Sequence, residues 1–405
     1  MSPPCDTLAK PEALTIRAFR SLDELPELSK AWEELLSEYP MATAFSSMEW
    51  LTSWWRSFGS GGKILVLAIF SSDSRLVGVA PLSIFRERFG GFLSLRVLRL
   101  MGDGSGDSDN LDLPVRPGFE KYLARAVLQY MEKQKQEWDL CQLNTMPPDS
   151  LVAESIVESL KPNWVFFEYS SVCSSIALPG AWDEYLQRLG GEDRKNLERY
   201  RRRLEKRYSI RIYRCTRESE LPVCLEALFR LHQSRWQNAG EPGSFASSQR
   251  REFYHQVSRR LLGRGLLELW VIELDGAIVA VQFAFRFRNK VFQLQEGYDP
   301  ERASDRVGFI LRGAVIKQLI SEGVQSYDFL GGTDPYKTRW GAQVGYYRSL
   351  QFAPSLSLGG AWLRSIHYAS RSKSWLRTVL PESAWNSLHT INLTLRGERN
   401  TKKED

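Results

Sequence analysis

The sequence predicts a mixed α/β protein made of two related halves. Two hairpin patterns support this prediction, one from Lys63 (KILVLAIFSSDSRLVGVAPLSIF) and one from Leu266 (LLELWVIELDGAIVAVQFAFRF). In each, two apolar runs flank a short polar segment, as is typical of paired strands. Each hairpin is then followed by a strand, a helix and another strand. That order predicts a parallel pair beside an antiparallel hairpin, repeated in the two halves.

Helices are expected before the first hairpin. Ser21 is followed three residues later by Glu24, a capping-box pattern that predicts a helix start. A second helix is predicted over 45–58, where Trp50 and Trp54 stand four residues apart. Tryptophans at this spacing favour a core role over a ligand platform.

After the first hairpin, the glycine-rich segment 102–106 (GDGSG) lacks the lysine and the helix register of a P-loop. We therefore expect a mobile loop there. The other elements predicted in this half are a strand at 95–101, a helix at 119–132 and a strand at 138–144.

The second half is expected to begin near Pro179-Gly180, a dipeptide that typically interrupts a strand. In its hairpin, Asp275-Gly276 predicts a tight turn, because glycine accepts a positive φ. The predicted domains are 1–178, 179–355 and a helical extension with a charged tail at 356–405. The remaining predicted elements are helices at 193–207, 218–238, 248–262 and 307–321 and strands at 291–298 and 326–330.

Composition narrows the function classes. The chain has 405 residues with 43% apolar and 25% charged side chains, which fits two globular domains. No apolar run approaches the roughly 18 residues that span a bilayer, and no secretory signal is evident, so a cytoplasmic location is expected. The 5 cysteines and 4 histidines lack ligand spacing, which argues against a metal enzyme. The net charge of +6 favours a polyanionic partner, either nucleic acid, a membrane surface or coenzyme phosphates.

One candidate site lies at the end of the predicted strand 291–298. By alternation, Phe292, Leu294, Glu296 and Tyr298 should share one face, so two core residues precede an acid and a phenol. Ligands often lie beyond the carboxyl ends of strands, which makes Glu296 and Tyr298 catalytic candidates. The alternative is a strand that simply emerges into solvent.

The following helix is the candidate cofactor site. Free backbone N–H groups at a helix start suit a pyrophosphate, and Arg306, Val307 and Gly308 stand at that position. An ordinary strand-to-helix turn is the alternative. Gln282 lies inside an apolar run, so its amide is either a structural hydrogen-bond link or a substrate contact.

A second candidate site is the segment 327–341 (YDFLGGTDPYKTRWG), where aromatic and cationic side chains alternate. Such a mixture can hold an acyl chain, an adenine ring or phosphates. The substrate-binding candidates here are Tyr336, Lys337, Arg339 and Trp340, and Asp328 is a candidate general base.

A third candidate site is the basic segment 193–207, with eight basic residues and three acidic ones. Leu197, Tyr200 and Leu204 should form its inward edge, leaving the cations outside. Arg199, Arg202 and Arg203 are the substrate-binding candidates, for RNA, phospholipid or coenzyme phosphates. A solvated helix face is the alternative.

Together, the basic segment, the 291–320 block and the 327–341 segment resemble the CelD-type acyltransferases associated with bacterial cellulose and exopolysaccharide synthesis. These are a GNAT branch related to the FemAB aminoacyl transferases. The resemblance implies two tandem GNAT-like domains and a C-terminal helical extension. It also implies acetyl-CoA or another acyl-CoA as donor at 291–320, and an amine or hydroxyl acceptor, such as a saccharide or small molecule, between the domains. The usual pattern Q/RxxGxG/A is reduced here to Arg306 and one glycine, which leaves charged tRNA as an alternative donor.

This resemblance leads to an expected mechanism of direct acyl transfer. Glu296 or Asp328 would take the acceptor's proton, and Tyr298 would protonate the leaving thiolate. Lys337 and Arg339 would hold an acidic acceptor or the coenzyme phosphates. A non-catalytic scaffold of a polysaccharide-secretion complex is a further alternative.

Overall fold

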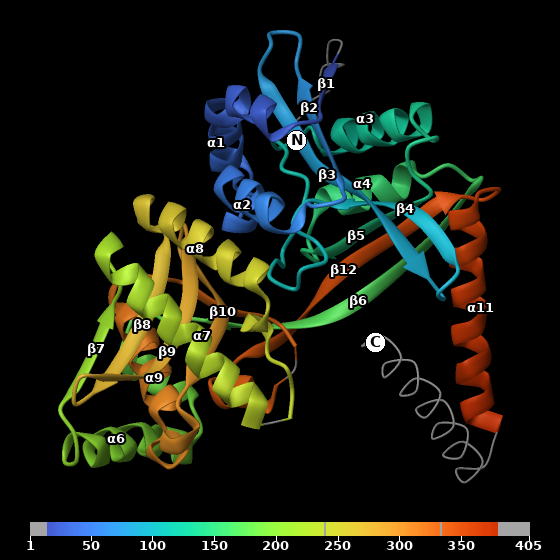
Figure 1. The fold of residues 1–405 in the computed structure, drawn as a ribbon. Coiled ribbons are helices and arrows are strands. Elements are labelled where there is room, and N and C mark those ends of the chain that lie inside the picture. Colours follow the sequence, from blue (N-terminus) through green and yellow to red (C-terminus); the bar gives the residue numbers. More distant parts are fainter. Residues whose placement is uncertain (1–13, 239, 333, 380–405) are drawn as a thin grey trace, which may run out of the picture.

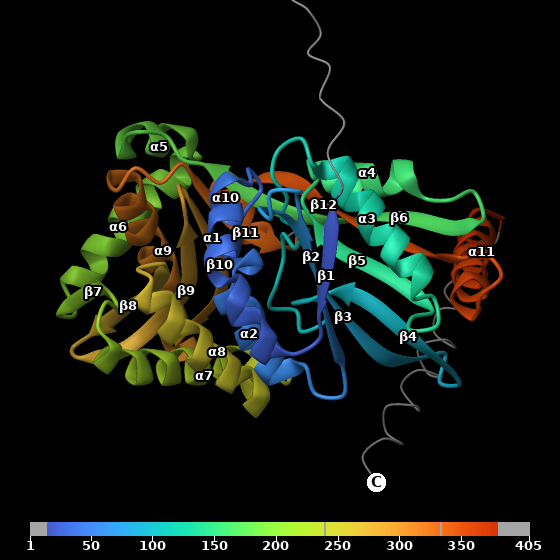
Figure 2. The same ribbon diagram turned by 90° about the horizontal axis from the view of Figure 1, so that it is seen from above.

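The computed structural model describes residues 14–238, 240–332 and 334–379 (Figure 1). Its described strands form one 12-stranded mixed sheet in the order β1-β2-β3-β4-β5-β12-β6-β11-β10-β9-β8-β7. Helices cover both faces of this sheet, which is divided into two lobes (Figures 1 and 2). The two lobes correspond to the two halves of the chain, except for the two central strands.

The first half supplies the lobe at the N-terminal end of the sheet. Its elements are β1 (Thr15–Phe19), α1 (Ser29–Glu38), α2 (Met48–Phe58), β2 (Lys63–Phe70), β3 (Leu76–Phe89), β4 (Leu93–Leu100), α3 (Glu120–Lys133), β5 (Leu140–Met146), α4 (Leu151–Ser159) and β6 (Trp164–Ala177).

The second half supplies the other lobe and a final helix. Its elements are α5 (Trp182–Arg188), α6 (Gly191–Glu205), β7 (Ile210–Arg214), α7 (Leu221–Asn238), α8 (Ser248–Gly263), β8 (Leu267–Leu274), β9 (Ala277–Phe287), β10 (Lys290–Tyr298), α9 (Val307–Ser321), β11 (Ser326–Gly331), α10 (Pro335–Arg339), β12 (Gln343–Pro354) and α11 (Leu358–Val379).

The predicted repeat of elements is confirmed. The hairpins β2–β3 and β8–β9 are antiparallel, and the pairs β4–β5 and β10–β11 are parallel. Asp275 and Gly276 both have positive φ, 50° and 82°, as the tight turn requires. The predicted core role of Trp50 and Trp54 is also confirmed, because their exposed fractions are 0% and 1%.

The two central strands, β6 and β12, were not predicted from the sequence. β12 pairs with β5 of the first lobe, β6 pairs with β11 of the second, and the two strands pair with each other along Trp164–Ser175 and Gln343–Pro354. Each half of the chain therefore supplies the strand that borders the other half's parallel pair. This exchange joins the lobes through backbone hydrogen bonds (Figure 2).

Within the segment 102–106, Gly104 and Gly106 are exposed, but its other residues and those after it are anchored by contacts, so its mobility stays a prediction. Asp107 is fully buried and accepts hydrogen bonds from Arg250 Nε at 2.9 Å and Tyr254 Oη at 3.0 Å. Trp54 Nε1 donates to Ser105 Oγ at 2.9 Å. Because Arg250 and Tyr254 belong to α8 of the other lobe, this loop is part of the contact between the lobes.

The C-terminal helix α11 packs against the central strands. Leu363 is fully buried there, and the rings of Trp362 and Phe89 lie 5.3 Å apart. The predicted extension of this helix to about Leu395, and the charged tail after it, lie outside the described residues. Within the described part of the chain, no helix combines the length and the apolar character that crossing a membrane requires.

Candidate functional site

The parallel strands β10 and β11 separate shortly after they begin. They pair only at Lys290–Phe292 with Ser326–Asp328, and β10 then bulges between Gln293 and Gln295. The bulge inserts an extra residue and reverses the alternation of side chains beyond it. Phe292 and Leu294 therefore belong to the core beneath α7 and α8, whereas Tyr298 belongs to the core beneath α9. The prediction that all four residues share one face was therefore wrong for Phe292 and Leu294, because a bulge cannot be seen in simple alternation. Glu296 and Tyr298 do share a face, and both line the pocket described below.

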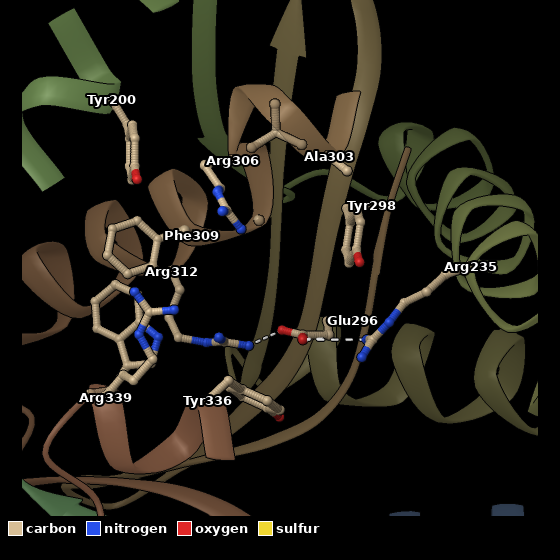
Figure 3. Close-up of a pocket in the computed structure, with 13 residues that line it drawn as sticks. Tyr200, Arg235, Glu296, Tyr298, Ala303, Arg306, Phe309, Arg312, Tyr336 and Arg339 are labelled. Carbon is tan, nitrogen blue, oxygen red and sulfur yellow. Dashed lines mark hydrogen bonds and ion pairs between the residues drawn. The ribbon is translucent and has the colours of Figure 1, made fainter. Parts of the chain in front are cut away.

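A pocket of about 250 Å³ opens where the strands separate, on the α9 side of the sheet (Figure 3). Residues from β10, α9 and α10 line it, and α6 and α7 contribute one side chain each. The lining residues are Tyr200, Arg235, Glu296, Tyr298, Ala303, Arg306, Val307, Gly308, Phe309, Arg312, Tyr336, Arg339 and Trp340.

The first turn of α9 forms one end of this pocket. Arg306 precedes the helix in the left-handed conformation, with φ 58°, and within the described part of the chain no side chain caps the helix start. The first N–H of the turn bonded to the preceding backbone is that of Ile310, which donates to Arg306 O at 3.0 Å. The N–H groups of Val307, Gly308 and Phe309 are thus available at the positive end of the helix dipole. This end of the pocket suits an anion.

Space and charge at the helix start favour the same conclusion. The three atoms nearest to a Cβ added at Gly308 all belong to Tyr298 and lie 3.7, 3.8 and 3.9 Å away, which is ordinary contact, so the backbone leaves room for a ligand. The guanidinium of Arg306 lies beside the phenol of Tyr200 and, among the described residues, forms no ion pair with a carboxylate. Its charge remains free for a ligand.

Arg312, Glu296 and Arg235 form an ion-pair chain across the floor of the pocket (Figure 3). Arg312 is only 5% exposed and donates from Nη2 to Glu296 Oε2, while Arg235 Nη1 lies 3.5 Å from Glu296 Oε1. A buried cation requires such a partner. Arg312 Nε has no hydrogen-bond partner within the described residues, so one buried donor still lacks an acceptor.

Aromatic rings complete the walls of the pocket. Trp340 is 2% exposed and packs 4.8 Å from the Phe309 ring, measured between centroids. The Arg312 guanidinium carbon lies 4.7 Å from the ring centroid of Tyr336. Burial raises the pKa of Tyr336, and the Glu296 carboxylate raises it further, so this phenol stays protonated at neutral pH. The walls suit a ligand that has flat or apolar parts besides its anionic group.

Some of the predicted substrate-binding residues lie elsewhere. Gln282 is 2% exposed and its Nε2 donates to Tyr327 Oη at 2.6 Å, which fits the structural alternative. Lys337 is 4% exposed, and its Nζ donates to the carbonyl oxygens of Gly331 at 2.6 Å and Gly332 at 3.2 Å. Neither side chain lines the pocket.

Asp328 lies on the opposite face of the sheet from the pocket. Its neighbour Tyr327 faces the core beneath α9, so Asp328 points the other way, towards Cys173 and Asp109. Burial raises the pKa of Asp328 to about 6, and the carboxylate of Asp109 adds to this effect. Asp328 and Glu296, the two candidate bases, are therefore separated by the end of β11.

The backbone beside Asp328 is strained. Leu330 has φ 60°, and its N–H donates to Asp328 Oδ1 at 2.7 Å. The next N–H, of Gly331, donates to Asp109 Oδ2 at 3.0 Å, so a carboxylate of the first half holds the end of β11. Non-glycine residues with positive φ are often found at functional sites. Within the described residues, no group of three or more His, Cys, Asp or Glu side chains is arranged to hold a metal ion.

The basic helix α6 lies beside the pocket and contributes Tyr200 to it. Arg202 is exposed and pairs with Glu198 at 2.7 Å, and the Arg199 guanidinium lies 5.1 Å from the Tyr200 ring centroid. Arg203 instead donates from Nη2 to Ser304 O at 2.5 Å. The prediction that the cations lie outside the inward edge of this helix holds for Arg203 as well, since its side chain is 47% exposed, although the loop before α9 offers it an acceptor.

Sequence reasoning did not select Arg235, Arg312 or Asp109. Arg312 interrupts the apolar stretch GFILRGAVI, and a cation in a buried helix must have a partner; this signal was available. Arg235 and Asp109 reach their sites from α7 and from the first half, so their positions depend on the tertiary structure.

Comparison with known proteins supports the fold. Residues 191–338 match the family model of an acetyltransferase (GNAT) domain. The crystal structure of FemX superimposes with a TM-score of 0.57 at 11% sequence identity, covering 86% of this chain and 99% of that chain. A conserved protein of unknown function from Bacteroides thetaiotaomicron superimposes with a TM-score of 0.51 at 12% identity, covering 84% of this chain and 100% of that chain. No curated protein matches the sequence of this chain.

At these identities, the structural likeness establishes the fold alone. The family match covers the half that contains the pocket, and the first half repeats the same order of strands and helix. The chain is a mixed α/β protein of two tandem GNAT-like domains, and its second half matches an acetyltransferase (GNAT) domain.

Proposed function

We propose that this protein is an acyltransferase that takes an acyl group from acyl-CoA and transfers it to an amine or hydroxyl acceptor. The observation that supports this proposal most is the pocket at the start of α9. There, free N–H groups and Arg306, which has no carboxylate partner among the described residues, lie beside aromatic side chains. A CoA thioester has the matching parts, which are phosphates, an adenine ring and a pantetheine arm with apolar stretches between its amides. The GNAT domain match over 191–338 supports the same class of reaction.

The side chains of the pocket hold and orient the donor. Val307, Gly308 and Arg306 bind its pyrophosphate. Tyr336 and Trp340 pack along the apolar stretches of its pantetheine arm. Tyr298, whose ring lies beside Gly308, is placed to return a proton to the leaving thiolate. Glu296 already pairs with Arg312 and Arg235, so in this proposal it orients both guanidiniums.

The acceptor approaches from the opposite face of the sheet, through the gap between β10 and β11. Arg235 supports this route, because α7 covers that face and yet its arginine reaches the pocket. Asp328 lies at the gap with a pKa of about 6, which suits a general base near neutral pH. It takes the acceptor's proton as the new bond to the acyl carbon forms and the C–S bond breaks.

An aminoacyl-tRNA donor is the second candidate. The observation that favours it is the exposed basic face of α6 beside the pocket, together with the FemX-like fold. A saccharide acceptor in cellulose, exopolysaccharide or cell-envelope synthesis remains the pathway that the CelD-type resemblance implies. A scaffold role would be indicated if neither CoA nor tRNA bound.

The test is the affinity for CoA and acetyl-CoA, measured by calorimetry on the full chain. Arg306→Glu should weaken binding by about 1–3 kcal/mol, because it replaces a charge-assisted contact with repulsion. Arg88→Glu, an equal charge reversal on the exposed end of β3 in the other lobe, should leave affinity unchanged. Equal loss in both variants, or no binding by the unmodified protein, would contradict the proposal.

A further inference from the structure

The pocket contains more cationic than anionic side chains. Four guanidiniums line it, from Arg235, Arg306, Arg312 and Arg339, against a single carboxylate from Glu296. Arg339 has its own partner outside the lining, because its Nη2 lies 2.7 Å from Asp193 Oδ1. Of the other three, Arg312 and Arg235 share Glu296, and Arg306 has no carboxylate partner among the described residues.

Arg312 and Glu296 form the tight pair among these groups. Arg312 is the most buried of the guanidiniums, and both it and Glu296 come from elements that form the floor of the pocket. Arg235 reaches the same carboxylate only at 3.5 Å, and its side chain is 32% exposed. After Glu296 has neutralised Arg312, two cations remain without a full counter-charge, Arg306 and Arg235.

These two cations lie at different places in the pocket. Arg306 lies at the start of α9, whereas Arg235 enters from α7, on the far side of Tyr298 and next to Glu296 (Figure 3). The Arg235 guanidinium carbon is 5.4 Å from the ring centroid of Tyr298, so the phenol lies between the two ends. A phosphate bound at the helix start leaves the remainder of the ligand to extend past Tyr298 towards Arg235.

We propose that the transferred acyl group carries a carboxylate of its own, and that Arg235 receives it. The donor is then the CoA thioester of a dicarboxylic acid, such as a succinyl or glutaryl thioester. This inference rests on the proposed function, since it takes the helix start as the phosphate end. A carboxylate beside Arg235 forms a charge-assisted hydrogen bond and supplies the missing counter-charge.

The same charges disfavour an aminoacyl group. Its ammonium would lie beside Arg235 and Arg312, and the carboxylate of Glu296 is already engaged by both. Like charges at this range repel strongly in a partly desolvated pocket. The inference therefore also separates the two donor candidates, because it excludes a cationic acyl group.

The experiment compares three thioesters on the full chain by calorimetry. Succinyl-CoA carries the carboxylate, butyryl-CoA has the same carbon chain without it, and β-alanyl-CoA carries an ammonium. The unmodified protein should bind succinyl-CoA at least about tenfold more tightly than butyryl-CoA, with β-alanyl-CoA weakest, as one charge-assisted hydrogen bond implies. Equal affinities, or preference for the neutral or cationic thioester, would overturn the inference.

Two variants assign the effect to Arg235. Arg235→Gln should bring the succinyl and butyryl affinities together, and Arg235→Lys should restore part of the preference. A preference that survives in Arg235→Gln would show that another group receives the carboxylate. If CoA binds in an Arg306-dependent way and all thioesters bind equally, only this inference fails. If CoA does not bind, the proposed function itself fails.

Discussion

The two lobes place a strand-to-helix connection at the same point of their folds, and the two connections differ. In the second lobe, β10 and α9 are joined by the short segment 299–306, and the gap beside it is a pocket lined by arginines. In the first lobe, β4 and α3 are joined by the long segment 101–119, which carries buried carboxylates. The first of these connections borders a pocket with four arginines, while the other carries buried carboxylates of its own.

The long connection also has a different task. Asp107 pairs with Arg250 of the other lobe, and Asp109 accepts from Gly331 N at the end of β11. The carboxylates of this connection therefore contact the second lobe, and one of them holds the end of β11. Two halves with the same order of elements can thus take different roles through the length and charge of one connection.

The largest expected effect tests Asp328 as the base. Asp328→Asn should lower the transfer rate by about 10²–10⁴-fold, because the amide cannot accept the acceptor's proton. In the unmodified protein the rate should rise with pH through about 6, where Asp328 ionises, and this step should vanish in the variant. Asp112→Asn is the control in the first lobe, since burial also raises the pKa of Asp112 to about 6. A similar loss of rate in Asp328→Asn and Asp112→Asn would contradict the assignment of the general base to Asp328 of the second lobe.

The second prediction compares a buried charge in each lobe. Arg312→Met and Asp107→Ala should each lower the free energy of unfolding by about 3–5 kcal/mol. The reason is that each substitution leaves the charge of its partner, Glu296 or Arg250, buried without a counter-charge. Urea denaturation measures both. Combining Arg312→Met with Glu296→Gln should recover part of the loss. Only the change at Arg312 should also weaken CoA binding. Weakened CoA binding in well-folded Asp107→Ala would contradict the assignment of donor binding to one lobe.

The third prediction concerns pH and stability in the first lobe. Burial raises the pKa of Asp112 to about 6 in the folded protein, above its ordinary value of about 4. The folded state then binds the proton more tightly than the unfolded state. This contribution to stability is present below about pH 4 and is lost as the pH rises through about 6.

The measurement is the pH dependence of the unfolding free energy, compared between the unmodified protein and Asp112→Asn. Their difference should change by about 1–3 kcal/mol between pH 4 and 7. A difference that stays constant over this range would show that Asp112 does not titrate as the structure implies.

The smallest expected effect is on α6. Arg202 is 71% exposed and pairs with Glu198, so Arg202→Glu should change the unfolding free energy by less than about 0.5 kcal/mol. The informative measurement on this variant is its affinity for tRNA and for CoA at different salt concentrations. If tRNA is the donor, affinity should fall steeply between about 50 and 200 mM salt and depend on Arg202. A shallow salt dependence with unchanged CoA affinity would assign α6 to a solvated surface.

Much of the fold was predictable because it depends on local patterns. The Asp275-Gly276 turn, the buried tryptophans of α2 and the two parallel pairs follow from turn chemistry and hydrophobic periodicity. The predicted boundary at residue 178 stays a prediction. The central strands β6 and β12 escaped prediction because β6 carries many exposed polar residues between Glu168 and Ser171. Its pairing is set by partners far away in the chain.

The candidate site was predictable in part. Arg306, Gly308, Glu296, Tyr298, Tyr336 and Trp340 were selected from the sequence and do line one pocket. Asp328 was selected as well, but only the structure places it on the opposite face of the sheet, because a strand pattern shows alternation and not which helix covers each face. The bulge in β10 was not predicted either, because the residue that is left unpaired does not differ in kind from the other residues of the strand.

The sequence by itself determined the kinds of elements, their order and the positive charge of the region around α9. These follow from side-chain propensities and short-range periodicity, which act within a few residues. Only the tertiary structure decided that Arg235 of α7 reaches Glu296, that Asp109 of the first half holds the end of β11, and that the two lobes exchange strands. Contacts between distant residues form only when the whole chain packs, because the burial that stabilises each of them depends on all the others.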